Sequence, residues 1–183
     1  MARQGDALGG LIEAELAQSQ PLDARILDAA CGIGTQTLPL AARGFRLVAR
    51  DLSPAAVARL QREANARRLL VDAAVADMRQ VGSSVVGSFD VVLAFDNSLA
   101  HLLTDDDLCT ALRQFLGALR PGGVFLCSVR DYDRFSVASL RPTPMVYVSI
   151  TGSDFGCGRN GHGMIRCTIG PRSSSIEKRP TAR

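Results

Sequence analysis

Residues 25–52 constrain this chain more than any other stretch, because they have the pattern of a strand, a glycine turn, a helix and a second strand. The first apolar run ends at Asp28 and the second at Asp51. Gly32 and Gly34 lie in the turn, where glycine lets the backbone approach a ligand closely. Asp51 follows Gly32 by 19 positions, where a carboxylate can meet a ribose diol. The unit therefore predicts a nucleoside-type cofactor.

Two residues of this unit bear on which nucleoside cofactor it binds. A dinucleotide-binding turn favours glycine at the position that Thr37 occupies. The carboxylate of Asp28, just before the turn, would repel a pyrophosphate but can receive an ammonium group. S-adenosylmethionine carries an ammonium group and no phosphate, so the turn favours it over NAD.

The same residues carry a family resemblance. The run Asp28-Ala-Ala-Cys-Gly-Ile-Gly-Thr resembles motif I of the class I S-adenosylmethionine-dependent methyltransferases, and residues 49–54 resemble their second motif. The resemblance implies a transferase of the EC 2.1.1 type with S-adenosyl-L-methionine as its cofactor. The alternative to this resemblance is a glycine turn in an α/β protein of another, unspecified kind.

Length and composition fit a single globular, soluble domain. The chain has 183 residues, of which 46% are hydrophobic, and no apolar run is long enough to span a bilayer. The first residues do not resemble a signal peptide, so we expect a cytoplasmic protein without a membrane partner. A net charge of +3, with two Tyr and no Trp, gives no reason to expect a nucleic-acid partner. The sequence does not indicate the oligomeric state.

Five cysteines, an odd number, are scattered along the chain, and we expect them to be reduced and mostly buried. Cys157, His162 and Cys167 are the one group with the chemistry of metal ligands. No fourth ligand accompanies them, so we expect no metal site.

The pattern of apolar runs predicts an α/β fold, with a Rossmann-like, doubly wound and mostly parallel sheet. Five runs alternate with helical segments, and a further amphipathic helix precedes the first strand at residues 6–17. Ser53 followed by Pro54 predicts one helix start, and Thr104 followed by three aspartates predicts another. The third to fifth strands are expected at residues 69–76, 89–95 and 124–129, the last after a turn at 120–123.

The pattern changes after residue 141. Residues 1–141 form the predicted S-adenosylmethionine-binding domain. Residues 142–183 are expected to be an irregular tail, either disordered or altered, with strand candidates only at 145–150 and 164–169. The carboxyl-terminal strands of the fold are therefore expected to be incomplete.

Polar residues follow the strands where ligands bind in an open parallel sheet, outside the carboxyl ends. Asp51 can accept hydrogen bonds from ribose hydroxyls, and Asp77 can accept one from the adenine amino group. Met78 or Leu52 can cover the adenine face. Each of these residues alone could instead be a turn residue or a helix cap.

A narrower resemblance rests on two segments. Phe95-Asp-Asn-Ser-Leu-Ala-His-Leu and Val129-Arg-Asp-Tyr-Asp look like the glycine and sarcosine N-methyltransferase family, which has Asn-Ser-x-x-His after the fourth strand and Arg-x-Tyr after the fifth. The resemblance implies that Arg130 holds the substrate carboxylate, that Asn97 orients the substrate and that Arg3 contacts the carboxylate of the cofactor. It also implies a cofactor lining of Ala30, Asp51, Asp77, Met78 and Phe95.

The chemistry suits these residues, because methyl transfer to an amine needs positioning more than a strong base. Arg130 offers a planar fork for a carboxylate, although Asp131 or Asp133 could instead pair with it on the surface. His101 is either a weak site residue that touches substrate or cofactor, or a structural residue at a helix start. Compared with the family, the chain is expected to be truncated at both ends.

We therefore predict an enzyme that methylates the amine of a small amino acid such as glycine or sarcosine. One alternative keeps the cofactor and changes the acceptor to another small metabolite. Nucleobase methylation is less favoured, because no Asp/Asn-Pro-Pro-Tyr segment follows the fourth strand. A catalytically idle cofactor-binding fragment and an NAD-linked reductase are the remaining alternatives.

Overall fold

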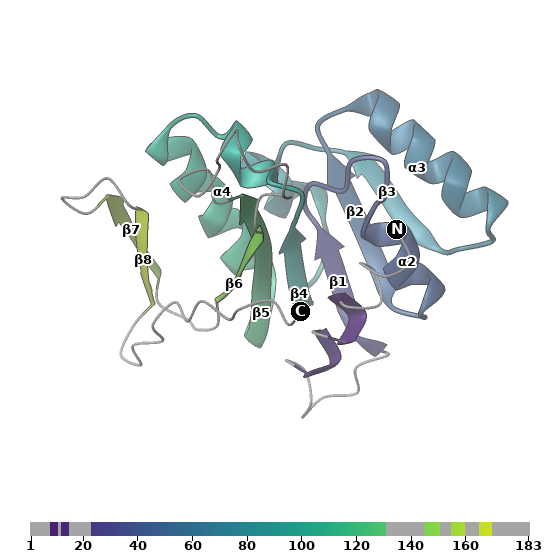
Figure 1. Ribbon diagram of the computed structural model, residues 1–183, viewed down its shortest axis with the longest axis horizontal. Helices are drawn as coiled ribbons and strands as arrows, with labels where there is room; N and C mark the ends of the chain where they lie inside the picture. The colour runs from purple at the N-terminus through teal and green to yellow at the C-terminus, as the bar shows by residue number, and fades with distance from the viewer. Residues whose placement is uncertain are drawn as a thin grey trace, which may run out of the picture.

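A single mixed sheet forms the centre of the molecule (Figure 1). The computed structural model describes residues 8–10, 12–14, 23–130, 145–150, 155–159 and 165–169, and for residue 130 and the last three ranges the backbone alone. The sheet order is β3-β2-β1-β4-β5-β6. Strands β1 to β5 are parallel, and β6 runs antiparallel to β5. Their bounds are Arg25–Asp28, Arg46–Asp51, Val71–Val75, Phe89–Ala94, Leu119–Arg130 and Met145–Ile150.

Helices cover both faces of this sheet, as doubly wound folds require. On one face, α2 (Thr37–Ala42) and α3 (Pro54–Ala66) pack through Leu40 and Leu60. On the other face, α4 (Asp105–Ala118) packs Phe115 against Phe125 of β5, with ring centroids 5.2 Å apart. The 3-10 helix η2 (Met78–Ser84) joins the α4 side through the fully buried Val81. The predicted Rossmann-like fold is confirmed.

Local sequence signals explain where the helices begin. The Ser53 hydroxyl accepts a hydrogen bond from the Ala56 N–H at 3.3 Å, directly before Pro54. The Thr104 hydroxyl accepts one from the Asp107 N–H at 3.1 Å. Both predicted helix starts are therefore confirmed. Of the helix expected at residues 6–17, the described residues 8–10 and 12–14 are helical.

The region of the predicted turn at residues 120–123 differs from expectation. It lies inside β5, where Phe89 pairs with Leu119 but Val91 pairs with Val124. The extra residues form an irregularity in which Gly122 has φ +76°. Pairing with β4 on both sides of this irregularity keeps the segment in the sheet.

Three strands follow residue 141 in the described part of the chain. The strand expected at residues 145–150 is confirmed as β6, which extends the main sheet. Strands β7 (Phe155–Arg159) and β8 (Ile165–Ile169) pair with each other. The division of the chain at residue 141 stays a prediction.

Two cysteines are as expected and one is not. Cys31 and Cys127 are buried thiols outside any disulfide, whereas Cys109 on α4 is disulfide-bonded. The prediction of reduced thiols is therefore wrong for Cys109. Helix α4 contacts β7, a pairing of distant segments that spacing along the chain does not reveal.

Candidate cofactor site

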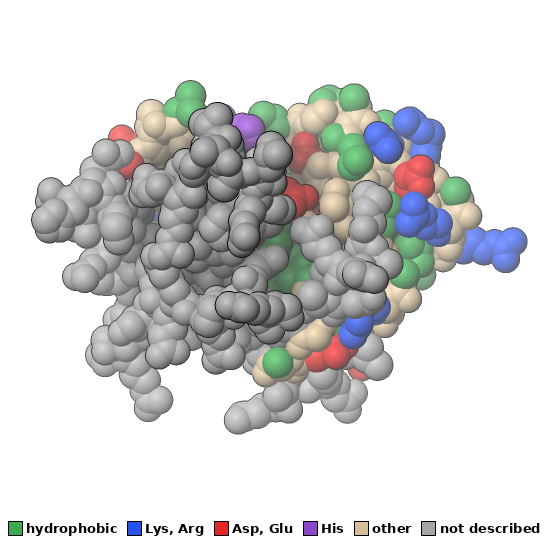
Figure 2. All heavy atoms as spheres, in the orientation of Figure 1, with side chains coloured by type: hydrophobic (Ala, Val, Ile, Leu, Met, Phe, Trp, Pro, Cys, Tyr) green, Lys and Arg blue, Asp and Glu red, His purple; other side chains and the backbone are tan. Residues whose placement is uncertain are grey.

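The fold brings the polar strand ends to one edge of the sheet, because parallel strands share their direction (Figure 1). Asp28 ends β1 and Asp51 ends β2, while Asp77 follows β3 and Asn97 follows β4. We call this the cofactor edge. Figure 2 shows acidic side chains, coloured red, at this edge.

The two turn glycines have different surroundings. Gly32 has φ +52°, and a Cβ atom built on it would meet no other atom within 4 Å. Gly34 has φ +91°, and its Cβ would lie 2.5 Å from Cδ1 of Leu60 and 3.0 Å from Cγ of Leu38. Gly32 therefore faces open space, whereas Gly34 allows α2 and α3 to pack closely against the turn.

Asp28 is buried beneath this turn and 1% exposed. The Thr37 hydroxyl donates a hydrogen bond to its Oδ2 at 2.7 Å, and the Ala30 N–H lies 3.4 Å from its Oδ1. Burial raises the pKa of Asp28 to about 6, and the negative charges of Asp51 and Asp96 contribute to this increase. The sequence reading used Thr37 only as a departure from the dinucleotide pattern and missed its contact with Asp28.

Asp51 connects the turns that follow β1 and β2. Its Oδ2 accepts a hydrogen bond from the Gly32 N–H at 2.7 Å, and its Oδ1 accepts one from the Ser53 N–H at 2.9 Å. A carboxylate offers about four lone-pair positions, so each oxygen can still accept a hydroxyl. Leu52, predicted to cover adenine, is 67% exposed beside it.

Asp77 caps the 3-10 helix η2 and forms an ion pair. Its Oδ1 accepts the Arg79 N–H at 2.8 Å, and the Arg79 guanidinium contacts both of its oxygens. The hydrogen bonds from the Arg79 side chain lower the pKa of Asp77. Asp77 is therefore a helix cap, the alternative weighed from the sequence. Met78 is half-buried against the α4-side core.

The segment after β4 has two consecutive residues in the left-handed region, Asp96 with φ +55° and Asn97 with φ +65°. Such backbone is uncommon for residues with a side chain. The Asp96 N–H donates a hydrogen bond to the buried Ser128 hydroxyl at 2.9 Å, which ties this segment to β5. Asn97 is half-buried, and His101 is exposed at the end of η3 (Ser98–His101).

The remaining predicted site residues lie in several environments. Phe95 is 3% exposed and packs in the core of the α2 face, while Ala30 is half-buried in the β1 turn. Arg130 ends β5 at the cofactor edge. Arg3 lies outside the described residues. Burial raises the pKa of the Cys31 thiol next to Gly32, which keeps this thiol protonated.

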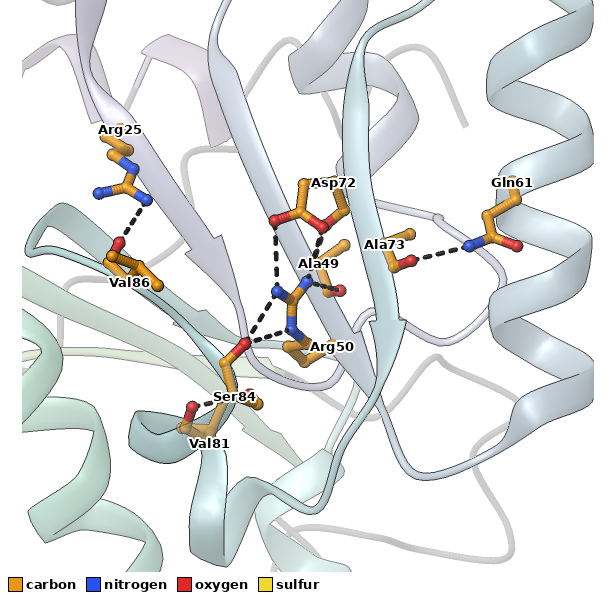
Figure 3. Close-up of polar contacts among 9 residues, drawn as sticks. All are labelled: Arg25, Ala49, Arg50, Gln61, Asp72, Ala73, Val81, Ser84 and Val86. Atoms are coloured by element: carbon orange, nitrogen blue, oxygen red, sulfur yellow. Dashed lines mark hydrogen bonds and ion pairs between the residues drawn. The ribbon is translucent and has the colours of Figure 1, made fainter.

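Sequence reasoning missed the buried Arg50, which precedes Asp51. Its guanidinium donates hydrogen bonds to the backbone oxygens of Ala49, Asp72 and Ser84, and it pairs with the Asp72 carboxylate at 3.2 Å (Figure 3). Arg50 therefore joins β2, β3 and the end of η2. The signal in the sequence was an arginine inside an apolar run, where a charge needs partners.

The described residues fit S-adenosylmethionine. The open space at Gly32 leaves room for a ligand against the backbone. Asp28 offers a buried acceptor for an ammonium group, and Asp51 has lone pairs for ribose hydroxyls. Among the described residues there is no group of three or more side chains suited to hold a metal ion. Within the same residues no helix is long and apolar enough to cross a membrane, and a cytoplasmic location stays a prediction.

Fold and site together define the class of S-adenosylmethionine-dependent methyltransferases. A family model described as a methyltransferase domain matches residues 26–123, more than half of the chain. The chain belongs to this methyltransferase domain family, and the predicted cofactor, S-adenosylmethionine, is confirmed.

Several known proteins are similar to this chain. A glycine/sarcosine N-methyltransferase of Parasynechococcus marenigrum (strain WH8102) is 35% identical over 109 residues, which cover 60% of this chain and 39% of that protein. The same-named protein of Halorhodospira halochloris is 32% identical, with coverages of 60% and 41%. The chain thus spans about two fifths of the length of these relatives.

The fold is also found among solved structures. An S-adenosylmethionine-dependent methyltransferase from Clostridium acetobutylicum ATCC 824 matches with a TM-score of 0.61 and 19% identity, covering 87% of this chain and 70% of that one. This likeness supports the fold.

Proposed function

We propose that this domain transfers a methyl group from S-adenosylmethionine to the amine of a small amino acid such as glycine or sarcosine. The observation that carries the proposal is the left-handed Asp96–Asn97 segment, which keeps an amide side chain at the cofactor edge despite an unfavourable backbone. The names of the two bacterial relatives support this substrate class.

Different residues of the cofactor edge bind different parts of the cofactor. Asp28 receives the cofactor ammonium group, Asp51 the ribose hydroxyls and Asp77 the adenine amino group. Arg3 is proposed for the cofactor carboxylate, and it lies outside the described residues. The cofactor supplies an electrophilic methyl group on a sulfonium.

The substrate is held by the ends of β4 and β5. Asn97 orients the amine, and Arg130 binds the substrate carboxylate through the paired N–H groups of its guanidinium. Both residues act by position, which can supply most of the rate in a transfer that needs no strong base.

A second candidate keeps the cofactor and changes the acceptor. A ubiquinone biosynthesis O-methyltransferase of Methylocella silvestris is 34% identical over 110 residues, nearly the identity of the glycine/sarcosine enzymes. This relative makes another small-molecule acceptor the second candidate, behind an amino acid.

The test is mass spectrometry of glycine and sarcosine after incubation with methyl-labelled S-adenosylmethionine. We expect labelled N-methyl products, and Arg130→Ala should raise the KM for glycine while leaving the affinity for S-adenosylhomocysteine unchanged. Arg46→Ala, at the opposite end of the sheet, is the matched control. Cofactor binding without any methylated amine would favour another acceptor or an idle domain. Equal losses of glycine use and of affinity for S-adenosylhomocysteine in Arg130→Ala would contradict the role of Arg130 in binding the substrate carboxylate.

A further inference from the structure

Arg79 surrounds the carboxylate that is proposed to bind adenine. Its backbone N–H donates to Asp77 Oδ1 at 2.8 Å, its Nε lies 3.1 Å from both carboxylate oxygens, and its Nη2 lies 2.6 Å from Oδ2. These contacts all come from Arg79, and they reach both oxygens of the carboxylate. They oppose rotation of the Asp77 side chain.

Counting lone pairs shows what remains for a ligand. A carboxylate offers about four acceptor positions, two on each oxygen. Three N–H groups use three of these positions: the backbone N–H lies on Oδ1, Nη2 lies on Oδ2, and Nε is shared between both oxygens. One acceptor position of the carboxylate is left for an outside donor.

Arg79 is itself held from a second direction. Its Nη1 donates to Asp107 Oδ1 at 2.9 Å, and the Asp107 N–H is bonded to the Thr104 hydroxyl at the start of α4. The guanidinium therefore joins η2 to the first turn of α4. An ordinary surface pair such as Arg67 with Glu63 has one contact within a single helix, and such pairs contribute little.

We propose that Arg79 is a positioning residue for the adenine end of the cofactor, which orients Asp77 so that its one remaining acceptor position receives the 6-amino group. The proposal rests on the proposed function, since it takes Asp77 as the adenine contact. It adds a basis for selectivity, because a 6-oxo purine presents an oxygen where Asp77 requires a donor.

Removal of Arg79 has a consequence that a purely structural role would not produce. Without the guanidinium, Asp77 loses the contacts that fix its rotation. Discrimination between a 6-amino and a 6-oxo purine should then fall together with the affinity for the cofactor.

The experiment compares Arg79→Met with Arg67→Met, which removes an arginine from an exposed ion pair on α3. Isothermal titration calorimetry with S-adenosylhomocysteine and with S-inosylhomocysteine, the 6-oxo analogue, is run at about pH 8, above the pKa of Asp28. For Arg79→Met we expect about a tenfold loss of affinity for S-adenosylhomocysteine and a reduced preference over the 6-oxo analogue. Arg67→Met should match the wild type.

The outcomes separate the role of Arg79 from the proposed function. Wild-type affinity and wild-type preference for S-adenosylhomocysteine in Arg79→Met would overturn the role of Arg79 alone. A wild-type protein that does not bind S-adenosylhomocysteine would instead contradict the proposed function. Should Arg79→Met not fold, Asp107→Asn loosens the guanidinium without removing it. For Asp107→Asn, a loss of affinity for S-adenosylhomocysteine of about two- to threefold supports the proposal, and an unchanged affinity overturns it.

Discussion

The turns after β1 and β4 both use left-handed backbone at the cofactor edge, but with different residue types. Gly32 and Gly34 adopt positive φ after β1, whereas Asp96 and Asn97 do so after β4. Glycine adopts this conformation readily, while a residue with a side chain is strained by roughly 1–3 kcal/mol. The first turn therefore leaves open space at Gly32 and room for packing at Gly34, whereas the second keeps its side chains despite the strain.

The largest expected effect is a loss of stability at Gly34, the glycine of the first turn that packs against α2 and α3. Gly34→Ala should destabilise the protein by about 4 kcal/mol, because positive φ and a clash with Leu60 act together. Urea unfolding measures this loss. Gly117→Ala on α4, where a Cβ has open space, is the control and should stabilise by about 0.5 kcal/mol. A tolerated Gly34→Ala would contradict the packing role.

The next effect is a dependence of protein stability on pH, which comes from Asp28 beneath the first turn. Its pKa in the folded protein is about 6, above the ordinary value of 3.8, so the folded state binds the proton more tightly than the unfolded state. Stability therefore falls as the pH rises from about 4 to about 6, by about 3 kcal/mol in total, and stays lowered above pH 6.

Asp28→Asn removes this titration and provides the measurement. Its stability relative to the wild type should increase by about 3 kcal/mol between about pH 4 and pH 7, when both proteins are unfolded with urea at each pH. Wild-type affinity for S-adenosylhomocysteine should rise with pH through about 6, as Asp28 ionises to receive the ammonium group. A constant stability difference across this range would show that Asp28 is not buried as described.

A smaller effect concerns the open side of the first turn. Gly32→Ala should lower the affinity for S-adenosylhomocysteine about tenfold, because its Cβ occupies space that is proposed for the cofactor. Gly44→Ala also has positive φ and open space, but it lies before β2 at the opposite end of the sheet. We expect comparable strain in both variants and lost affinity only in Gly32→Ala, as calorimetry would show. Equal affinities would place the cofactor elsewhere.

The smallest effect is a gain of stability in the second turn. Asp96→Gly relieves left-handed strain and removes a negative charge that raises the pKa of Asp28, so it should stabilise the protein by about 0.5–1 kcal/mol at pH 7. The same change at Asn97 should reduce methyl transfer without weakening cofactor binding. Thermal unfolding and product analysis measure the two results. A destabilised Asp96→Gly would mean that the segment is not strained.

The elements of the fold were predictable where their signals are local. The buried run of β4 and the caps Ser53 and Thr104 lie within a few residues of the structure that they specify. The irregularity in β5 was not predictable. A glycine-containing segment has the same sequence pattern whether it forms a turn before a strand or an irregularity inside a paired strand. The disulfide at Cys109 was missed because it depends on long-range contacts.

The meeting of polar strand ends in the candidate site was predictable, and their contacts with one another were less so. Spacing placed Asp28 and Asp51 at the ends of neighbouring parallel strands, which the structure shows side by side. It could not tell that Gly34 serves packing, because a glycine looks the same in either role. Arg50 pairs with Asp72 on β3 and Arg79 pairs with Asp107 on α4, and only the folded chain reveals these two partners.

The hydrogen bond from the Gly32 N–H to Asp51 Oδ2 places a spectroscopic reporter inside the site. A short bond of 2.7 Å to a carboxylate moves an amide proton to a distinctive chemical shift, which depends on the electron density of the acceptor oxygen. When ribose hydroxyls draw on that same carboxylate, the resonance of this one glycine should move. Its position in an NMR titration would then report sugar occupancy directly, even for analogues that carry no transferable group.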